Sequence, residues 1–222
     1  MNGLLWKIHQ AAREKNEAQV DLLMKSDEPL GSYPSPDHGD LLYFAILNKY
    51  LPLAHWLIEK GVVGFLDREA TLEYVFLSLC ADDCDLTIKI GERLLPLTQK
   101  EANYFLMHAC LENLTKQEDF QRLFRWAIKQ GADPNMRTPD GMTLIHMLCM
   151  EEEHSHLILA VDSLIHEGAD LLAEDDDGET ALTASRSYTC ELAVDYVRAK
   201  IEQQKLEQET CAAVGSGRGT RL

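Results

Sequence analysis

Glycines that end predicted helices recur at a nearly constant interval along this chain. Gly131 and Gly168 each begin a Gly-Ala-Asp run, and they are 37 residues apart. Gly61 precedes Gly131 by 70 residues, which is twice 35. Each glycine follows a stretch with the apolar spacing of a helix, and glycine commonly terminates helices. The interval therefore predicts a repeated unit of roughly 35 residues, built mainly from helices.

The residues that follow these glycines repeat as well. Asp140-Gly141 and Asp177-Gly178 are turn dipeptides, and each precedes a threonine, Thr143 or Thr180, and a short apolar helix. A threonine in this place is suited to cap the helix, because its oxygen accepts from free amides. One helix pair cannot bury its apolar stripe alone, so neighbouring pairs must stack in a row. The predicted domain covers residues 1–208, in units at 5–36, 37–66, 67–98, 99–134, 135–169 and 170–208.

Three motifs of the chain resemble those of ankyrin repeats. Thr143-Leu144-Ile145-His146 is similar to the start of the family's first helix, and Ile8-His9-Gln10-Ala11-Ala12 is similar to that helix itself. Gly131-Ala132-Asp133-Pro134-Asn135 is similar to the terminator of the unit. The resemblance extends over roughly residues 5–203 and implies an all-α solenoid of about six stacked helix pairs joined by short hairpin-like loops. At two unit starts, leucine or alanine replaces the family's proline.

Proteins of this family bind other proteins, so the resemblance implies a scaffold or adaptor with no catalytic site and no cofactor. Its partner would dock on the hairpin tips and the inner helices. By motif position the tips are residues 136–140 and 171–177. The predicted contact residues are Arg137, Asp140, Met142, Glu174, Asp176 and Glu179. Methionine and acidic side chains together favour a partner surface that is basic and partly apolar.

Net charge restricts the choice of partner further. The chain has 21 Lys and Arg against 37 Asp and Glu, which is a formal net charge of −16. Such a surface repels phosphate backbones and anionic membranes, so we expect neither nucleic acid nor a membrane as a partner. No apolar run approaches the ~20 residues of a membrane-spanning helix, and the first ten residues do not resemble a signal peptide. We expect a cytoplasmic monomer whose six cysteines are reduced.

A group of metal-binding residue types supplies an alternative function. His146, Cys149, His154 and His156 lie within eleven residues, and imidazole and thiolate are zinc ligands. The resemblance instead gives His146 a structural hydrogen-bonding role and Cys149 a buried position. No nucleophile elbow, HExxH or P-loop motif accompanies the group. We therefore expect no metal and no catalytic residue, and an enzyme or zinc protein that uses the His146–His156 region is the second hypothesis.

Acidic and cysteine residues near position 83 are interpreted as structural. Asp82, Asp83 and Asp85 are expected in a solvated loop. Cys80 and Cys84 have three residues between the thiols, one more than a typical zinc or redox pair. The pattern predicts two half-buried thiols at a helix end.

The C-terminal residues 209–222 are predicted to form a flexible tail, because they are small, polar and rich in glycine. Their last three residues, Thr220, Arg221 and Leu222, fit the ligand pattern of PDZ domains, which add such a tail as a strand. A Glu-rich stretch followed by a small, polar end also resembles the C-terminal signal of bacterial effectors delivered by type IV secretion. That resemblance implies an effector that acts on a host protein in the host cytoplasm.

Overall fold

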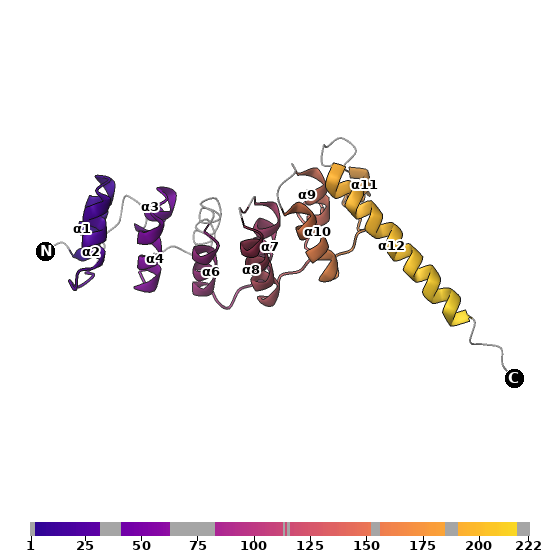
Figure 1. Ribbon diagram of the computed structural model, residues 1–222, viewed down its shortest axis with the longest axis horizontal. Helices are drawn as coiled ribbons and strands as arrows, with labels where there is room; N and C mark the ends of the chain where they lie inside the picture. Colours follow the sequence, from indigo (N-terminus) through magenta and orange to yellow (C-terminus); the bar gives the residue numbers. More distant parts are fainter. Residues whose placement is uncertain are drawn as a thin grey trace. The chain divides into compact units, whose positions relative to one another are not determined.

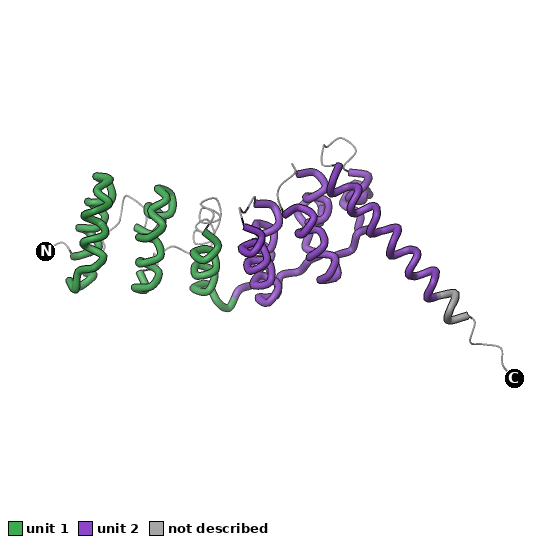
Figure 2. Tube along the Cα trace, in the orientation of Figure 1, with its two compact units in different colours: residues 1–96 green, residues 97–222 purple. Residues whose placement is uncertain are grey.

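The computed structural model describes residues 3–31, 41–62, 83–112, 114, 116–151, 156–184 and 191–216. Regular secondary structure in these ranges is helical, apart from two isolated antiparallel bridges, Arg137 with Thr143 and Glu174 with Thr180. Among the same residues, no helix is both long enough and apolar enough to span a bilayer. The chain divides into two compact units, residues 1–96 and residues 97–222 (Figure 2).

The first unit is built from helices paired through short turns (Figure 1). Helix α1 packs on α2, α3 packs on α4, and α2 and α6 each contact α4. The bounds are Leu4–Arg13 for α1, Glu17–Met24 for α2, Leu41–Leu47 for α3, Leu51–Glu59 for α4 and Cys84–Arg93 for α6. Lys15 and Lys49 lie in the turns of the first two pairs, and both have a φ of 56°. This left-handed geometry reverses the chain within a few residues, so that the two helices of a pair can lie against each other.

Apolar side chains at helical spacing form the core of the first unit. The buried ones include Leu4, Leu5, Ile8, Leu42, Ile46, Leu53, Leu57, Leu86 and Ile90. Two side-chain donors also tie consecutive helix pairs together. Trp56 Nε1 donates to the carbonyl oxygen of Met24 at 3.1 Å, and Arg93 Nη2 donates to that of Ile58 at 2.7 Å. Each donor satisfies a backbone carbonyl at the end of a helix in the preceding pair.

The second unit repeats the pairing and adds a long final helix. Helix α7 packs on α8, α9 contacts α7, α10, α11 and α12, and α10 packs on α12. The bounds are Gln99–Leu111 for α7, Gln117–Lys129 for α8, Leu144–Met150 for α9, Leu157–His166 for α10, Ala181–Ala184 for α11 and Glu191–Ser216 for α12. Helix α7 begins with a capping box, in which Thr98 Oγ1 accepts from the Glu101 N–H and the Glu101 carboxylate accepts from the Thr98 N–H. The cap fixes where the second unit begins.

The final helix extends beyond the predicted start of the tail. Helix α12 continues to Ser216, past residue 209. Ile201 is buried, and the ten residues after it, 202–211, are all exposed. Alanine has the highest helix propensity of all residues, so the alanines after residue 211 favour continuation of the helix. The predicted PDZ-ligand residues 220–222 lie outside the described part of the chain.

Candidate partner-binding site

Two hairpin loops of the second unit form the region in which the contact residues are predicted. The first loop joins α8 to α9, and the second joins α10 to α11. Each starts at a glycine in the left-handed region, Gly131 with a φ of 92° and Gly168 with a φ of 89°. Residues with a Cβ rarely adopt this geometry, so the two glycines end their helices as the sequence predicts.

Each loop is closed by its own backbone hydrogen bonds. In the first, the N–H of Thr138 donates to the carbonyl oxygen of Met142 at 2.9 Å. In the second, the N–H of Asp175 donates to the carbonyl oxygen of Glu179 at 2.9 Å. The side-chain Oδ1 of Asp175 accepts in return from the Glu179 N–H at 2.9 Å. Two loops with the same internal bonding therefore lie one repeat apart.

Arg137 joins the tips of the two loops. Its Nη1 donates to the carbonyl oxygen of Gly141 in its own loop at 2.8 Å and to that of Glu174 in the next loop at 2.7 Å. The N–H of Asp176 donates to the carbonyl oxygen of Asp140 at 3.3 Å. A charged donor forms stronger hydrogen bonds than a neutral one, so the guanidinium keeps the tips side by side.

An asparagine joins the bases of the same loops. Asn135 Nδ2 donates to the carbonyl oxygen of Gly168 at 3.0 Å, and its Oδ1 accepts from the Asp170 N–H at 2.7 Å. One unit earlier, Asn103 Oδ1 of α7 accepts from the Asp133 N–H at 2.8 Å. The Asn103 amide therefore fixes the start of the first loop to α7, and the Asn135 amide fixes the start of the second loop to the first. These bonds leave the loops little freedom to move relative to each other.

His146 connects the second loop to helix α9. The ring is 1% exposed. Nδ1 accepts from the Thr143 N–H at 3.2 Å and lies 2.9 Å from the Thr143 hydroxyl oxygen, and Nε2 lies 3.0 Å from the carbonyl oxygen of Glu179. Since Nδ1 accepts, Nε2 carries the proton and donates to Glu179. Both ring nitrogens are occupied within the fold, which is the structural role that the resemblance implied.

The structure places all six predicted contact residues in this joined pair of loops. Asp140, Glu174 and Asp176 are exposed at the tips. Arg137 is exposed too, but its guanidinium is already bound to two backbone carbonyls. Met142 and Glu179 are half-buried. Three of the six predicted contact residues therefore present exposed carboxylates, on a backbone that is cross-bonded at its tips and at its bases.

The described residues of the alternative zinc site, His146, Cys149 and His156, are all buried. No group of three or more metal-ligand side chains occurs among the described residues, which exclude His154. Cys149 is fully buried. His156 is 2% exposed and stacks on Phe120 with 5.0 Å between ring centroids. Burial lowers the pKa of His156, because a charged imidazolium is disfavoured away from water. Cys149 and His156 therefore pack in the core of the second unit.

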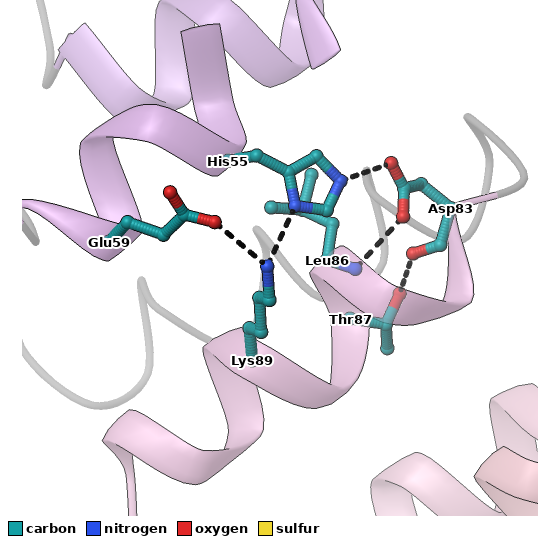
Figure 3. Close-up of polar contacts among 6 residues, drawn as sticks. All are labelled: His55, Glu59, Asp83, Leu86, Thr87 and Lys89. Atoms are coloured by element: carbon teal, nitrogen blue, oxygen red, sulfur yellow. Dashed lines mark hydrogen bonds and ion pairs between the residues drawn. The ribbon is translucent and has the colours of Figure 1, made fainter. Parts of the chain in front are cut away.

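A second polar cluster lies in the first unit, between α4 and α6 (Figure 3). His55 Nε2 lies 2.8 Å from Asp83 Oδ2, and Lys89 Nζ lies 3.3 Å from His55 Nδ1. Lys89 Nζ also contacts Glu59 Oε1 at 3.4 Å. Asp83 Oδ1 accepts from the Leu86 N–H at 2.9 Å and so caps α6. The cluster joins two helices through one histidine and one capping aspartate.

An aspartate and a histidine in contact also occur in catalytic sites, where the histidine acts as a general base. An ammonium group only donates, so Nδ1 of His55 accepts from Lys89 and Nε2 donates to Asp83. A general base needs one nitrogen free to meet a substrate. Both nitrogens of His55 are occupied, and the cluster is best explained as a connection between helices.

The same cluster corrects two expectations from the sequence. Asp83 was expected in a solvated loop, but its side chain is only 15% exposed and bonds to both α6 and His55. Cys84 lies at a helix end as expected, since it is the first residue of α6, but it is 3% exposed and so is buried where half-burial was expected. An aspartate three residues before Leu86 of an apolar helix is an N-cap signal, which the acidic run concealed. Asp82 and Cys80 lie outside the described residues.

Comparisons with known proteins identify structural neighbours only. No protein-family model matches the sequence, and no curated protein matches it. The chain is similar in structure to EF0377, an ankyrin repeat protein, with 15% identity, coverage of 90% of this chain and 98% of that chain, and a TM-score of 0.58. It is also similar to one chain of the complex between the predatory endopeptidase Bd0816 from Bdellovibrio bacteriovorus and the immunity protein Bd3460. There the identity is 17%, the match covers 87% of this chain and 97% of that chain, and the TM-score is 0.54. At these identities the likeness is one of fold.

Proposed function

We propose that this chain, which has the all-α ankyrin-repeat fold that its sequence predicts, is a non-catalytic module that binds a partner protein. The observation that carries the proposal is the joined pair of loops in the second unit. Three of its exposed carboxylates, those of Asp140, Glu174 and Asp176, stand on backbone held by Arg137 and Asn135. A surface that is already ordered loses little conformational entropy on binding. One of the two structural neighbours above was itself solved in a complex of two proteins, which supports a binding role.

The charge of the site and of the whole chain points to a basic partner. The formal net charge is −16. Opposite charge speeds encounter and fixes the register of docking. In this proposal the acidic residues, Glu179 among them, make the polar contacts, and the half-buried Met142 adds adaptable apolar surface. Arg137 positions the two loops through its hydrogen bonds to Gly141 and Glu174, and it is one of several residues on the proposed contact face.

Affinity capture with mass spectrometry tests the proposal. The test variant carries Glu174→Lys, Asp176→Lys and Glu179→Lys. The matched control carries the same change of net charge at exposed acids elsewhere, as Glu14→Lys, Glu92→Lys and Glu118→Lys. We expect the control to retain proteins that the wild type captures and the test variant to lose them. Equal recovery by both variants would refute the proposed contact face.

The zinc or enzyme hypothesis has less support than the binding hypothesis. Its first ligand, His146, already uses both ring nitrogens within the fold. Zinc quantification on the purified chain separates the two hypotheses. A full equivalent of zinc that chelators remove with loss of structure would favour the metal site and count against a purely binding role.

A narrower version of the proposal is that the partner is a host protein reached by type IV secretion. The support for it is the composition of the chain's C-terminal end, and the residues after 216 lie outside those described. Deleting residues 215–222 tests it, with delivery into host cells as the readout. Unchanged delivery refutes the secretion signal, and unchanged capture of PDZ proteins by the same deletion refutes the PDZ ligand.

A further inference from the structure

The second hairpin loop, which joins α10 to α11, exposes a leucine near its base. Leu172 is 56% exposed, while its neighbours Leu171 and Ala173 are 3% and 8% exposed. The N–H of Leu172 donates to Asp170 Oδ1 at 2.9 Å, so a side chain two residues earlier holds the backbone in a tight turn. The leucine therefore faces solvent from an ordered position, between the contact of Asp170 at the base of the loops and that of Glu174 at their tips.

The first loop has an asparagine at the equivalent position. The N–H of Asn135 donates to Asp133 Oδ1 at 2.8 Å, in the same kind of turn. The Asn135 side chain then bonds to the next loop, at Gly168 and Asp170. Leucine cannot form such hydrogen bonds, and the described residues after the second loop form α11 and α12 and contain no third loop of this kind. The position that binds a neighbouring loop in the first case is therefore exposed and apolar in the second.

The part of the chain around this leucine is strongly acidic. Residues 138–185 contain twelve Asp and Glu and no Lys or Arg, so these 48 residues account for −12 of the formal net charge of −16. Arg137 supplies the basic charge of the two joined loops, and its guanidinium is bound to backbone carbonyls. The exposed acids close to Leu172 in the chain are Glu167, Asp170, Glu174 and Asp176.

The basic residues of the neighbouring helix α12 do not neutralise this charge. Arg198 pairs with Asp195, and Lys200 Nζ lies 2.8 Å from Asp162 Oδ1. The exposed residues 202–211 of the same helix include three Glu and one Lys, so they add negative charge. The surface of the second unit therefore presents an apolar side chain within a region of negative charge.

We propose that Leu172 is the apolar anchor of the partner-binding face, and that the partner's docking segment carries a large apolar side chain flanked by Lys or Arg. The inference rests on the binding function proposed above and names the chemistry of the partner. Burial of the leucine side chain contributes affinity, and the ordered turn beneath it limits the entropy lost on binding. The acidic residues attract and orient the cations of the partner. A second copy of this chain does not fit, because it would bring two acidic loops together.

Selection from a display library of short random peptides against the wild-type chain tests the inference. We expect the selected peptides to be rich in Lys and Arg and to carry an apolar residue among them. Leu172→Asn introduces the residue that the first loop has, and it should weaken binding of these peptides about tenfold or more. Thermal unfolding followed by circular dichroism should show the fold unchanged, because the replaced side chain is exposed.

Leu22→Asn is the matched control. Leu22 is 64% exposed and lies on α2 of the first unit, so its replacement should leave peptide binding unchanged. Equal effects of the two substitutions would show non-specific apolar binding and overturn the inference. Selected peptides without an excess of Lys and Arg would overturn it as well.

The triple variant with Glu174→Lys, Asp176→Lys and Glu179→Lys separates this inference from the proposed function. Loss of peptide binding in both this variant and Leu172→Asn supports the two together. Loss in the triple variant alone would leave the acidic contact face standing and refute the leucine anchor. Loss in Leu172→Asn alone would refute the acidic face and, with it, the basic partner inferred here. Unchanged binding in both would refute both.

Discussion

Replacing Gly141 with alanine should loosen the joint between the two hairpin loops of the second unit. Gly141 has a φ of 77°. A Cβ at this position would lie 2.4 Å from Asp176 Oδ1 and 2.7 Å from the backbone nitrogen of Asp176. The carboxylate can rotate away, but the backbone nitrogen is held by its hydrogen bond to the carbonyl oxygen of Asp140. The second loop must therefore move to accept the methyl group.

Two effects contribute to the expected loss of stability. A non-glycine residue in the left-handed region costs about 1–2 kcal/mol. Moving the second loop also weakens the hydrogen bond from Asp176 to Asp140 and the one from Arg137 to Glu174, each worth about 0.5–1.5 kcal/mol. Together these effects should lower the free energy of unfolding of the second unit by about 2–5 kcal/mol.

Gly178→Ala provides the matched control. Gly178 has a φ of 75° and the same place in the next loop, but a Cβ there would meet nothing within 4 Å. Its substitution should cost only the backbone strain of about 1–2 kcal/mol. Urea unfolding followed by Trp126 fluorescence, in a background with Trp6→Phe and Trp56→Phe, reports on the second unit. An equal loss of stability in the two variants would refute the argument that Gly141 joins the loops.

Three further predictions concern charged and titratable groups. Burial lowers the pKa of His156 below its unfolded value, so the stability of the neutral ring, present above about pH 6.5, is lost as the pH falls. In urea titrations, His156→Phe should flatten the decline of the unfolding free energy between about pH 7 and pH 5. A hydrogen bond from Lys200 lowers the pKa of Asp162, so Asp162→Asn should destabilise the chain at neutral pH. The difference should shrink as the pH falls below about 3.9 and vanish once the pH is below the lowered pKa, where the carboxyl is protonated in both states. Asp83→Ala should destabilise the first unit by about 1 kcal/mol through loss of the α6 cap, and a double-mutant cycle with His55→Ala should give a positive coupling.

The fold could be predicted because its strongest signals are local. A glycine that must adopt a positive φ, as Gly131 and Gly168 do, is visible in the sequence without knowledge of any distant contact. The turn dipeptides and the threonines after them are local signals too, and they place α9 and α11 correctly. Repetition of the same signals at one interval then implies stacking, because a lone helix pair has no core. The comparison with solved structures confirms that prediction.

The candidate site was only partly predictable, because its geometry depends on partners far along the chain. Motif position placed Arg137 at a hairpin tip, but its bond to Glu174 spans 37 residues and gives it a positioning role that no local pattern indicates. The pairing of His55 with Asp83 spans 28 residues and was hidden for the same reason.

The sequence separations bridged by the side-chain hydrogen bonds follow from the repeat, and they lead to a last prediction. Bonds between neighbouring helix pairs join residues 32 apart at Trp56, 35 apart at Arg93 and 33 apart at Asn135. These spans match the interval between the punctuating glycines, because each pair meets only the pairs next to it. A disturbance should therefore fade with distance along the chain. Native-state amide exchange should show Gly141→Ala accelerating exchange in α9 and α10 while leaving α1 and α2 at wild-type rates. Acceleration of α1 and α2 to the same extent would mean that the whole chain opens as one cooperative body.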